Sequence, residues 1–388
     1  MRGGKASFLS RLYSRHQPFR SLSVGERLAG ASPPSVFIGR FGYPKVLIGP
    51  LVPPASGDTR EMDFPEEWIP SGKSARQIIN FRLQLVRGKQ AVSVHDTGRI
   101  TQLVQEIALS EKPAEVELSF SKRPSGGFLH EELQPFGPSA PFKELRVDSG
   151  RFEHNLERAY HDTDLSARDA IVELYERGTP VSFIQRALSV GALGLGQNRK
   201  LVPTRWAITA VDSTMSEKLL EEVKALPPIE NQSLVFEHSS LSNTFIILLF
   251  PSTWQFEWIE AFFPQIIGDR LEIFSDREGF ARKTEYSSVG GCYYSARLAV
   301  CEKLKELRRQ AGALVLREAY SDYVPLGVWN VRENIRQALR AQPKEFDSFG
   351  AALAYALSRL RLPLPAWRAH SAILRSRSTQ MQLASFLR

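Results

Sequence analysis

The run Phe245-Ile-Ile-Leu-Leu-Phe250, closed by Pro251, is the longest uninterrupted apolar stretch in the chain. A membrane-spanning helix needs about 20 apolar residues, so this run is too short to cross a bilayer. A short apolar run with β-branched residues that ends at a proline is typical of a strand buried on both faces. The run therefore predicts a buried strand at 244–250, and we do not expect the chain to enter a membrane.

Further short elements surround this strand in both directions. Strands are expected at 35–39 and 45–49, which form a hairpin, and at 115–120, 206–211, 233–237 and 313–317. Helices are expected at about 73–87, 98–110, 151–161, 166–177, 180–190, 293–310, 329–340 and 347–359, and another begins at Thr214 and ends before Pro227. Because these elements interleave without a regular βαβ repeat, the pattern predicts an α+β fold. A chain of 388 residues is too long for one ordinary core, so we expect two closely associated regions.

The net charge of +8 is concentrated at the two ends of the chain. Residues 1–30 hold six Lys and Arg against Glu26 alone, and six arginines but no acidic residue follow Asp347. We expect a disordered basic arm at 1–32 and a flexible basic tail at 363–388, in which residues 371–379 bury little surface. Such ends attract the phosphate backbone of DNA in a salt-dependent way. Flexible termini are also charged for solubility alone, and this alternative stays open.

Cys292 and Cys301 are the only cysteines. They are too few, and spaced too far apart, for a tetrahedral zinc site or a disulfide framework. A reducing compartment is the simplest one for such a chain. We therefore expect a cytoplasmic protein that binds no zinc and needs no cofactor.

The last residues, Gln380-Met-Gln-Leu383-Ala-Ser-Phe386-Leu387, follow the pattern Q-x-x-h-x-x-a-a. One turn of 3₁₀ helix brings Leu383, Phe386 and Leu387 together as an apolar plug, while the amide of Gln380 can both donate and accept hydrogen bonds. The pattern resembles the peptide by which replication and repair proteins dock on the PCNA sliding clamp. The alternative is a hydrophobic end that packs back on its own domain.

The rest of the chain resembles the Nre family of archaeal DNA-repair proteins. The stretches that carry the resemblance are PPSVFIGRFGYPKVLIGPLVPP (33–54), GDTREMDFPEEW (57–68), ERAYHDTDLSARDAIVELYERG (157–178), LVPTRWAITAVDSTMS (201–216), GGCYYSARLAVCEKL (290–304) and YVPLGVWNVRE (323–333). The resemblance implies a role in the DNA-damage response with clamp docking, and two regions at 33–275 and 276–362 ahead of the tail at 363–388. Many members of the family begin with a cysteine-rich zinc segment, which residues 1–32 lack.

Two groups of cations are candidates for binding DNA or nucleotide phosphates. Arg199 and Lys200 follow a glycine-rich turn, with Arg205 close behind, and such a turn can present backbone N–H groups to a phosphate. The turn is not a P-loop, because the Lys-Ser/Thr pair is missing. Lys122 and Arg123 form the second group. In both cases a solvated surface loop is the alternative.

No catalytic residue can be assigned from the sequence, and we expect a factor that is not an enzyme, or only weakly one. Carboxylates gather at Asp58, Asp63, Glu66 and Glu67 and again at Asp162, Asp164 and Asp169, where His154 and His161 lie nearby. Such clusters hold Mg²⁺ in two-metal nucleases, but acidic residues are also common at helix starts for capping alone. The alternative function is thus a metal-dependent nuclease or nucleotide-processing enzyme recruited by the clamp, and Mg²⁺ is expected only in that case.

Overall fold

The computed structural model describes residues 22–126, 135–148, 150–264, 270–281 and 283–377. The described residues form two compact units, an N-terminal unit of residues 22–215 with 325–327 and a C-terminal unit of residues 216–324 with 328–377. Each unit combines helices with one mixed six-stranded sheet, which confirms the predicted α+β fold. None of the described helices is long and apolar enough to span a membrane.

The sheet of the N-terminal unit has the strand order β1-β5-β6-β4-β3-β2. All neighbours are antiparallel except β6 and β4, which are parallel. The predicted hairpin is confirmed, because β2 and β3 pair antiparallel. The strands are β1 (Arg27–Ser32), β2 (Val36–Ile38), β3 (Lys45–Val52), β4 (Val86–Ser93), β5 (Ala114–Phe120) and β6 (Ser139–Asp148).

Three helices of the N-terminal unit, α3, α5 and α6, begin at a side-chain cap. The hydroxyl of Ser74 accepts from the N–H of Gln77 in a capping box, and the hydroxyl of Ser166 accepts from the N–H of Asp169 at 3.1 Å. Each cap satisfies a backbone donor that the first helical turn leaves free. The elements are η1 (Arg60–Asp63), α2 (Pro65–Trp68), α3 (Ala75–Gln84), α4 (Arg99–Leu109), α5 (His154–His161), α6 (Ala167–Glu176), α7 (Val181–Ser189) and η2 (Gly196–Asn198).

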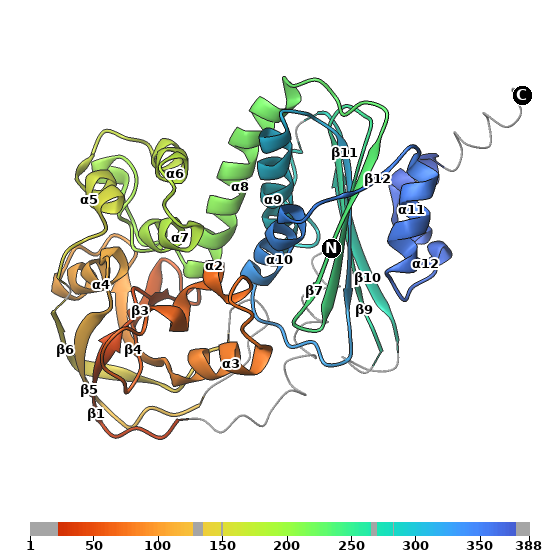
Figure 1. Ribbon diagram of the computed structural model, residues 1–388. Coiled ribbons are helices and arrows are strands. Elements are labelled where there is room, and N and C mark those ends of the chain that lie inside the picture. Colours follow the sequence, from red (N-terminus) through yellow and green to blue (C-terminus); the bar gives the residue numbers. More distant parts are fainter. Residues whose placement is uncertain (1–21, 127–134, 149, 265–269, 282, 378–388) are drawn as a thin grey trace, which may run out of the picture. The chain divides into compact units, whose positions relative to one another are not determined.

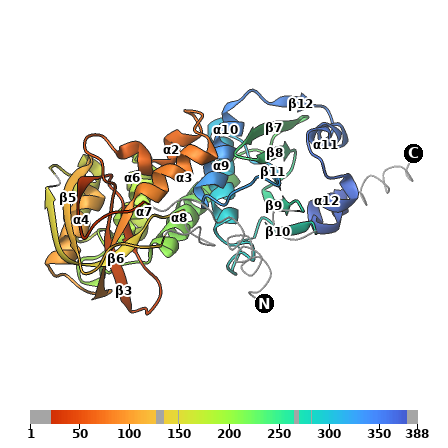
Figure 2. The same ribbon diagram turned by 90° about the horizontal axis from the view of Figure 1, so that it is seen from below.

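The sheet of the C-terminal unit is covered on both faces. Its strand order is β10-β9-β11-β8-β7-β12, with only β9 and β11 parallel. Helices α9 and α10 lie on one face, and α11 and α12 lie on the other (Figure 1, Figure 2). The elements are β7 (Ser233–Ser240), β8 (Asn243–Phe250), β9 (Gln255–Phe262), β10 (Glu272–Glu278), β11 (Gly312–Ala319), β12 (Lys344–Phe346), α9 (Gly291–Leu307), α10 (Trp329–Arg340), α11 (Phe349–Ser358) and α12 (Leu364–His370).

The apolar run at 245–250 is the core of this sheet. Every residue of β8 is buried, and the same holds for its antiparallel neighbour β11. A strand flanked by helices on both faces is typically a near-continuous apolar run. The strand predicted at 244–250 is therefore confirmed.

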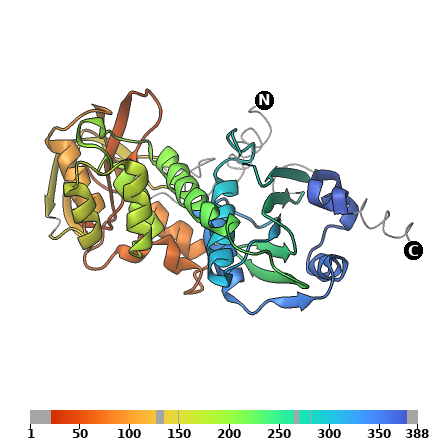
Figure 3. The ribbon, with the colours of Figure 1, turned by 90° about the horizontal axis from the view of Figure 1, so that it is seen from above.

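Helix α8 (Thr204–Lys224) corrects one prediction (Figure 3). A strand at 206–211 and a helix that starts at Thr214 were expected, but one continuous helix covers both. Ala207, Val211 and Met215 are all buried and lie four residues apart, so they form one helical stripe. The β-branched residues suggested a strand, but packing of this stripe overrides local propensity.

The end of the described chain corrects a second prediction. Residues 371–379 were expected to bury little surface, but Ser371, Ile373 and Leu374 are buried and residues 372–377 are helical. Ile373 and Leu374 join the apolar cluster that contains Trp367 of α12 and Ala356 of α11. Two apolar side chains among the Arg and Ser residues therefore pack this segment into the core of the C-terminal unit.

Candidate nucleic-acid contact site

The turn between β2 and β3 carries exposed aromatic side chains. Phe41 is 74% exposed and Tyr43 is 41% exposed. The turn is tight, because the N–H of Lys45 donates to the Gly42 carbonyl at 2.9 Å and Gly42 adopts a φ of +84°. Glycine adopts this left-handed backbone conformation readily, because it has no Cβ to clash. Both rings are thus held on a rigid turn and face solvent.

The start of α8 brings a third aromatic side chain to this turn. Trp206 is 45% exposed, and its ring centroid lies 5.1 Å from that of Tyr43, with the planes tilted by 52°. The hydroxyl of Thr204 accepts a hydrogen bond from the N–H of Ile38 at 3.0 Å. This bond ties the first turn of α8 to β2. We call Phe41, Tyr43 and Trp206 the aromatic surface.

Two of the predicted phosphate-binding residues lie beside the aromatic surface. The N–H of Val94 donates to the Pro44 carbonyl at 2.9 Å, and the N–H of Leu201 donates to the Val94 carbonyl at 2.8 Å. These two bonds place Val94 between the β2–β3 turn and Leu201, which follows the exposed Lys200. Arg205 precedes Trp206 directly and is half-buried. The segment after the glycine-rich turn therefore brings cations to the same side of the unit as the aromatic surface.

The turn itself contributes more positive charge. Lys45 is exposed, and the guanidinium of Arg40 lies 5.0 Å from the ring centroid of Phe41. Aromatic rings stack on unpaired bases, and neighbouring cations attract the phosphate backbone. Rings and cations on one rigid turn are the combination that such binding requires.

Arg199, in contrast, points into the fold. Its guanidinium donates to the carbonyl oxygens of Gly194 (2.7 Å), Tyr160 (2.6 Å), Asp162 (2.6 Å) and Ala159 (3.2 Å). Burial lowers its pKa, and Tyr160 and Asp162 act in the opposite direction. Three of these carbonyls belong to the end of α5 and the residue after it, where an arginine satisfies acceptors that the helix leaves free.

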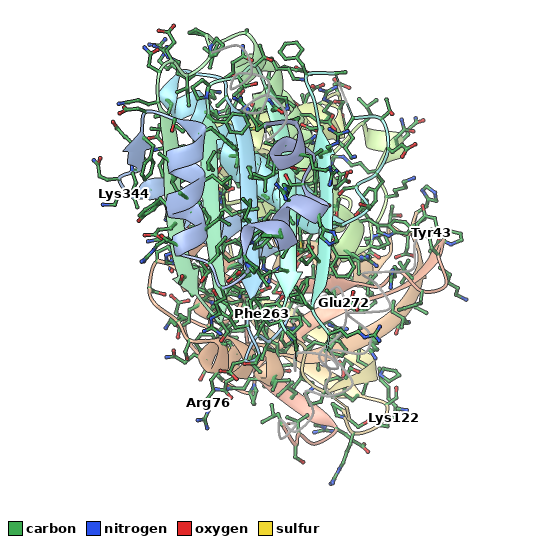
Figure 4. The ribbon with its side chains drawn as sticks, turned by 90° about the vertical axis from the view of Figure 1, so that its right-hand side faces the viewer. Tyr43, Arg76, Lys122, Phe263, Glu272 and Lys344 are labelled. Atoms are coloured by element: carbon green, nitrogen blue, oxygen red, sulfur yellow. The ribbon has the colours of Figure 1, made fainter. Side chains whose placement is uncertain are left out.

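Lys122 and Arg123 lie elsewhere in the N-terminal unit. Both are exposed and follow β5 after Ser121. The N–H of Ser121 donates to the Pro141 carbonyl at 2.9 Å, which sets this segment against the start of β6. Figure 4 labels Tyr43 and Lys122 and shows them well apart. The two predicted phosphate-binding groups therefore do not form one site.

Three buried arginines that the sequence patterns did not single out also belong to this unit. Arg82, Arg87 and Arg186 are each less than one-tenth exposed. Arg82 pairs with the carboxylate of Asp63, and the guanidinium of Arg186 stacks on Phe183 at 4.0 Å. The pKa of each of these three arginines is lowered, mainly by burial. Arg87 lies in the stretch Leu85-Val-Arg-Gly-Lys89, where Gly88 and Lys89 hide the strand pattern.

The predicted carboxylate clusters hold hydrogen bonds and ion pairs instead. Asp63 accepts from Ser35 and pairs with Arg82, and Glu66 accepts from the N–H and the hydroxyl of Ser182 at 2.8 and 2.9 Å. Asp162 accepts from the backbone N–H groups that follow it. Within the described ranges, no group of three or more His, Cys, Asp or Glu side chains could hold a metal ion.

The predicted clamp-binding residues, Gln380, Leu383, Phe386 and Leu387, lie outside the described residues. The segment that leads to them is described as far as Arg377. The guanidinium of Arg377 donates to the Pro251 carbonyl at 3.2 Å and lies 4.7 Å from the ring centroid of Phe250. The chain is therefore anchored to the C-terminal unit three residues before Gln380.

Comparison with known proteins identifies the family. The model "Archaeal Nre, N-terminal" matches residues 5–267, and "Archaeal Nre, C-terminal" matches residues 278–386. The chain is 43% identical over 374 residues to "DNA repair protein NreB" of Archaeoglobus fulgidus, which covers 94% of this chain and 93% of that protein. It is 36% identical to "DNA repair protein NreA" of the same organism (97% of this chain, 94% of that protein) and 32% identical to "DNA repair protein NreA" of Haloferax volcanii (89% and 86%). No solved structure matches the chain significantly. The chain belongs to the archaeal Nre family.

Proposed function

We propose that this chain is a DNA-repair factor that docks on the PCNA sliding clamp through its C-terminal peptide and contacts DNA at the aromatic surface. Membership of the Nre family supports the repair role, because the three relatives above are each named a DNA repair protein. A clamp-tethered protein meets DNA at an effective concentration of about 1 mM. A small contact surface is then sufficient.

The observation that carries clamp docking is the pattern formed by Gln380, Leu383, Phe386 and Leu387. Only Ser378 and Thr379 separate it from Arg377, which is held against Pro251 and Phe250. Because the peptide starts close to an anchored point, its tether to the folded unit is short. A short tether loses little conformational entropy when the peptide binds.

The aromatic surface supports contact with unpaired DNA rather than with an intact duplex. A stacked base contributes about 1–3 kcal/mol, but the base must first leave the duplex. The cations beside the rings, Arg40, Lys45 and Lys200, supply the salt-dependent attraction to the strand. The proposal therefore assigns the rings to the bases and the cations to the backbone.

Clamp docking is tested with Phe386→Ala in the full chain, against Ser385→Ala as the matched control at a position that the pattern leaves free. Truncation of a central aromatic anchor costs about 2–4 kcal/mol, which corresponds to about 30- to 1,000-fold weaker binding. Affinity for purified PCNA is measured by calorimetry. The two variants are compared with the unaltered chain at the same salt concentration.

We expect Ser385→Ala to bind as the unaltered chain does and Phe386→Ala to lose most of its affinity. Equal affinity of both variants would show that the C-terminal pattern is not the docking peptide. In that case family membership alone would support the repair role.

A further inference from the structure

Positive side chains gather around β4 of the N-terminal unit. Arg87 and Lys89 of β4 are two residues apart, so they lie on the same face of the sheet. Lys89 is the register partner of Pro141 in β6, and the Pro141 carbonyl accepts from the N–H of Ser121. Lys122 therefore follows at the surface beside Lys89. We call Arg82, Arg87, Lys89 and Lys122 the cationic row.

The described carboxylates do not balance this row. Asp63 pairs with Arg82 at the buried end. Among the described residues, no Asp or Glu forms an ion pair with Arg87, Lys89 or Lys122. The row thus holds three more positive charges than its described partners neutralise.

Arg87 is the member whose position demands a partner. It is only 6% exposed, and the ring centroids of Phe37 and Phe136 lie 3.8 and 4.1 Å from its guanidinium carbon. The two rings cover the faces of the guanidinium, so its N–H groups are left to bond in its own plane. Its Nε is buried and has no hydrogen-bond partner within the described part of the chain.

An uncompensated row of this kind is unfavourable. A buried ion without a partner costs several kcal/mol. Burial, and secondly the positive charge of Arg82, lower the pKa of Arg87 to about 9. Burial also lowers the pKa of Lys89, and Arg87 and Lys122 add to this effect. Arg87 stays protonated at neutral pH, so a bound anion would relieve the repulsion.

We propose that the cationic row binds a phosphate group, with Arg87 at its buried end and Lys122 at its exposed end. The planar guanidinium matches the oxygens of a phosphate and can donate two hydrogen bonds to them, and the lysines add charge. The ligand is a phosphate monoester, carried either by a free nucleotide or by the 5′ end of a DNA strand. This inference is independent of clamp docking and of the aromatic surface.

The test measures binding to the full chain of inorganic phosphate, a nucleoside 5′-monophosphate, and a short oligonucleotide with and without a 5′-phosphate. Lys89→Gln and Lys122→Gln each remove one charge from the row without creating a buried cavity. Lys112→Gln is the control, since Lys112 is exposed in the turn before β5 and outside the row. Affinities come from calorimetry, and Tm is recorded with each ligand because binding to the folded state raises it.

We expect Lys89→Gln and Lys122→Gln to bind about tenfold more weakly, as loss of a charge-assisted hydrogen bond does, and Lys112→Gln to bind normally. Tighter binding of the mononucleotide than of inorganic phosphate would identify a free nucleotide as the ligand. A preference for the 5′-phosphorylated over the unphosphorylated strand would identify a DNA end. Absence of phosphate binding, or equal losses in all three variants, would overturn the proposal.

Arg87→Gln gives a second, independent readout in phosphate-free buffer. Arg87→Gln also loses the contacts with Phe37 and Phe136, so the diagnostic quantity is the increase in Tm that phosphate causes, which the substitution should abolish. An equal increase in Arg87→Gln and in the unaltered chain, or no increase in either, would overturn the role of Arg87.

Discussion

Two buried glutamates of the C-terminal unit contrast with one buried arginine of the N-terminal unit. The C-terminal unit buries Glu257 and Glu318 and surrounds both carboxylates with hydrogen-bond donors. The N-terminal unit buries Arg87 and leaves its Nε without a partner among the described residues. A buried charge whose hydrogen bonds are made is part of the fold, whereas a buried arginine with no carboxylate partner among the described residues is a candidate for binding an anion.

The two glutamates show what a satisfied buried charge achieves. Glu257 of β9 accepts from the hydroxyl of Ser371 at 2.5 Å and from the N–H groups of Ala372 and Ile373 at 2.7 and 3.1 Å. It thereby caps the helical residues 372–377 from another part of the chain. The free backbone donors of the C-terminal segment are thus used to fix it to the sheet.

Glu318 of β11 does the same for the connection between α11 and α12. Its carboxylate accepts from the N–H groups of Arg361 and Leu362 at 2.8 to 3.0 Å and from the hydroxyl of Tyr320 at 2.9 Å. Both glutamates lie on central strands, and both hold residues that follow α11. The chain before the clamp-binding pattern is therefore fixed at two points.

The largest effect is expected from Glu257→Ala. Removal of this carboxylate leaves buried backbone donors unsatisfied, and loss of one side of a buried charged network costs about 3–5 kcal/mol. Urea unfolding of the C-terminal unit within the full chain measures the change. Hydrogen exchange at 371–377 reports whether the segment detaches locally.

Two variants sharpen this prediction. Ser371→Ala removes the hydroxyl that donates to Glu257 and accepts from the N–H of Leu374, and loss of these two hydrogen bonds should cost about 1–2 kcal/mol. Glu272→Ala alters a half-buried glutamate at the start of β10 and serves as the control, with an expected change within about 0.5 kcal/mol. If Glu257→Ala destabilised no more than Glu272→Ala, the satisfied carboxylate would not anchor the segment.

The docked segment shows why part of the fold could not be predicted. The run at 245–250 has one physical interpretation, because six apolar residues in succession can only be buried. Residues 371–377 contain only three aliphatic side chains among Arg and Ser, and the partner that fixes them, Glu257, lies more than 100 positions away. The composition of a segment does not indicate which carboxylate of a distant strand will bind it.

An intermediate effect is expected from Trp206→Ala. This substitution compares an exposed tryptophan of the N-terminal unit with a buried tryptophan of the C-terminal unit. Trp367 is fully buried in the core of the C-terminal unit, whereas Trp206 is 45% exposed beside Tyr43. Loss of a stacking ring should weaken binding of single-stranded DNA by about 1–3 kcal/mol and leave the free energy of unfolding almost unchanged. Fluorescence anisotropy of a labelled oligonucleotide measures the affinity.

Leu47→Ala is the matched control, because Leu47 is exposed on the same hairpin but is not aromatic. It should bind single-stranded DNA as the unaltered chain does. If both substitutions had the same effect on DNA affinity, the hairpin would act through its shape alone and the rings would have no role in binding.

The candidate site was predictable only where neighbours in sequence are also neighbours in space. Lys200 and Arg205 were singled out from their spacing, and both lie in the segment that leads into Trp206; their role in binding phosphate stays a prediction. The same spacing indicated Arg199, whose side chain turns inward to the carbonyls at the end of α5. Arg87 was missed because Gly88 and Lys89 interrupt the apolar alternation of β4, so a predicted helix was extended to residue 87.

The smallest effect is expected from His238 in β7, which is partly buried and whose Nε2 has no hydrogen-bond partner among the described residues. Burial lowers its pKa, so the folded state favours the neutral ring. As the pH falls below about 6.5, the unfolded chain takes up the proton first and stability is lost. Solvent screening keeps this loss below about 1 kcal/mol. Urea unfolding at pH 7.5 and pH 5 should show a smaller loss for His238→Gln than for the unaltered chain. If both proteins lost the same free energy of unfolding, water would satisfy the hydrogen bond of the His238 ring. A buried polar atom without a partner would then affect stability only where it carries a net charge, as in Arg87.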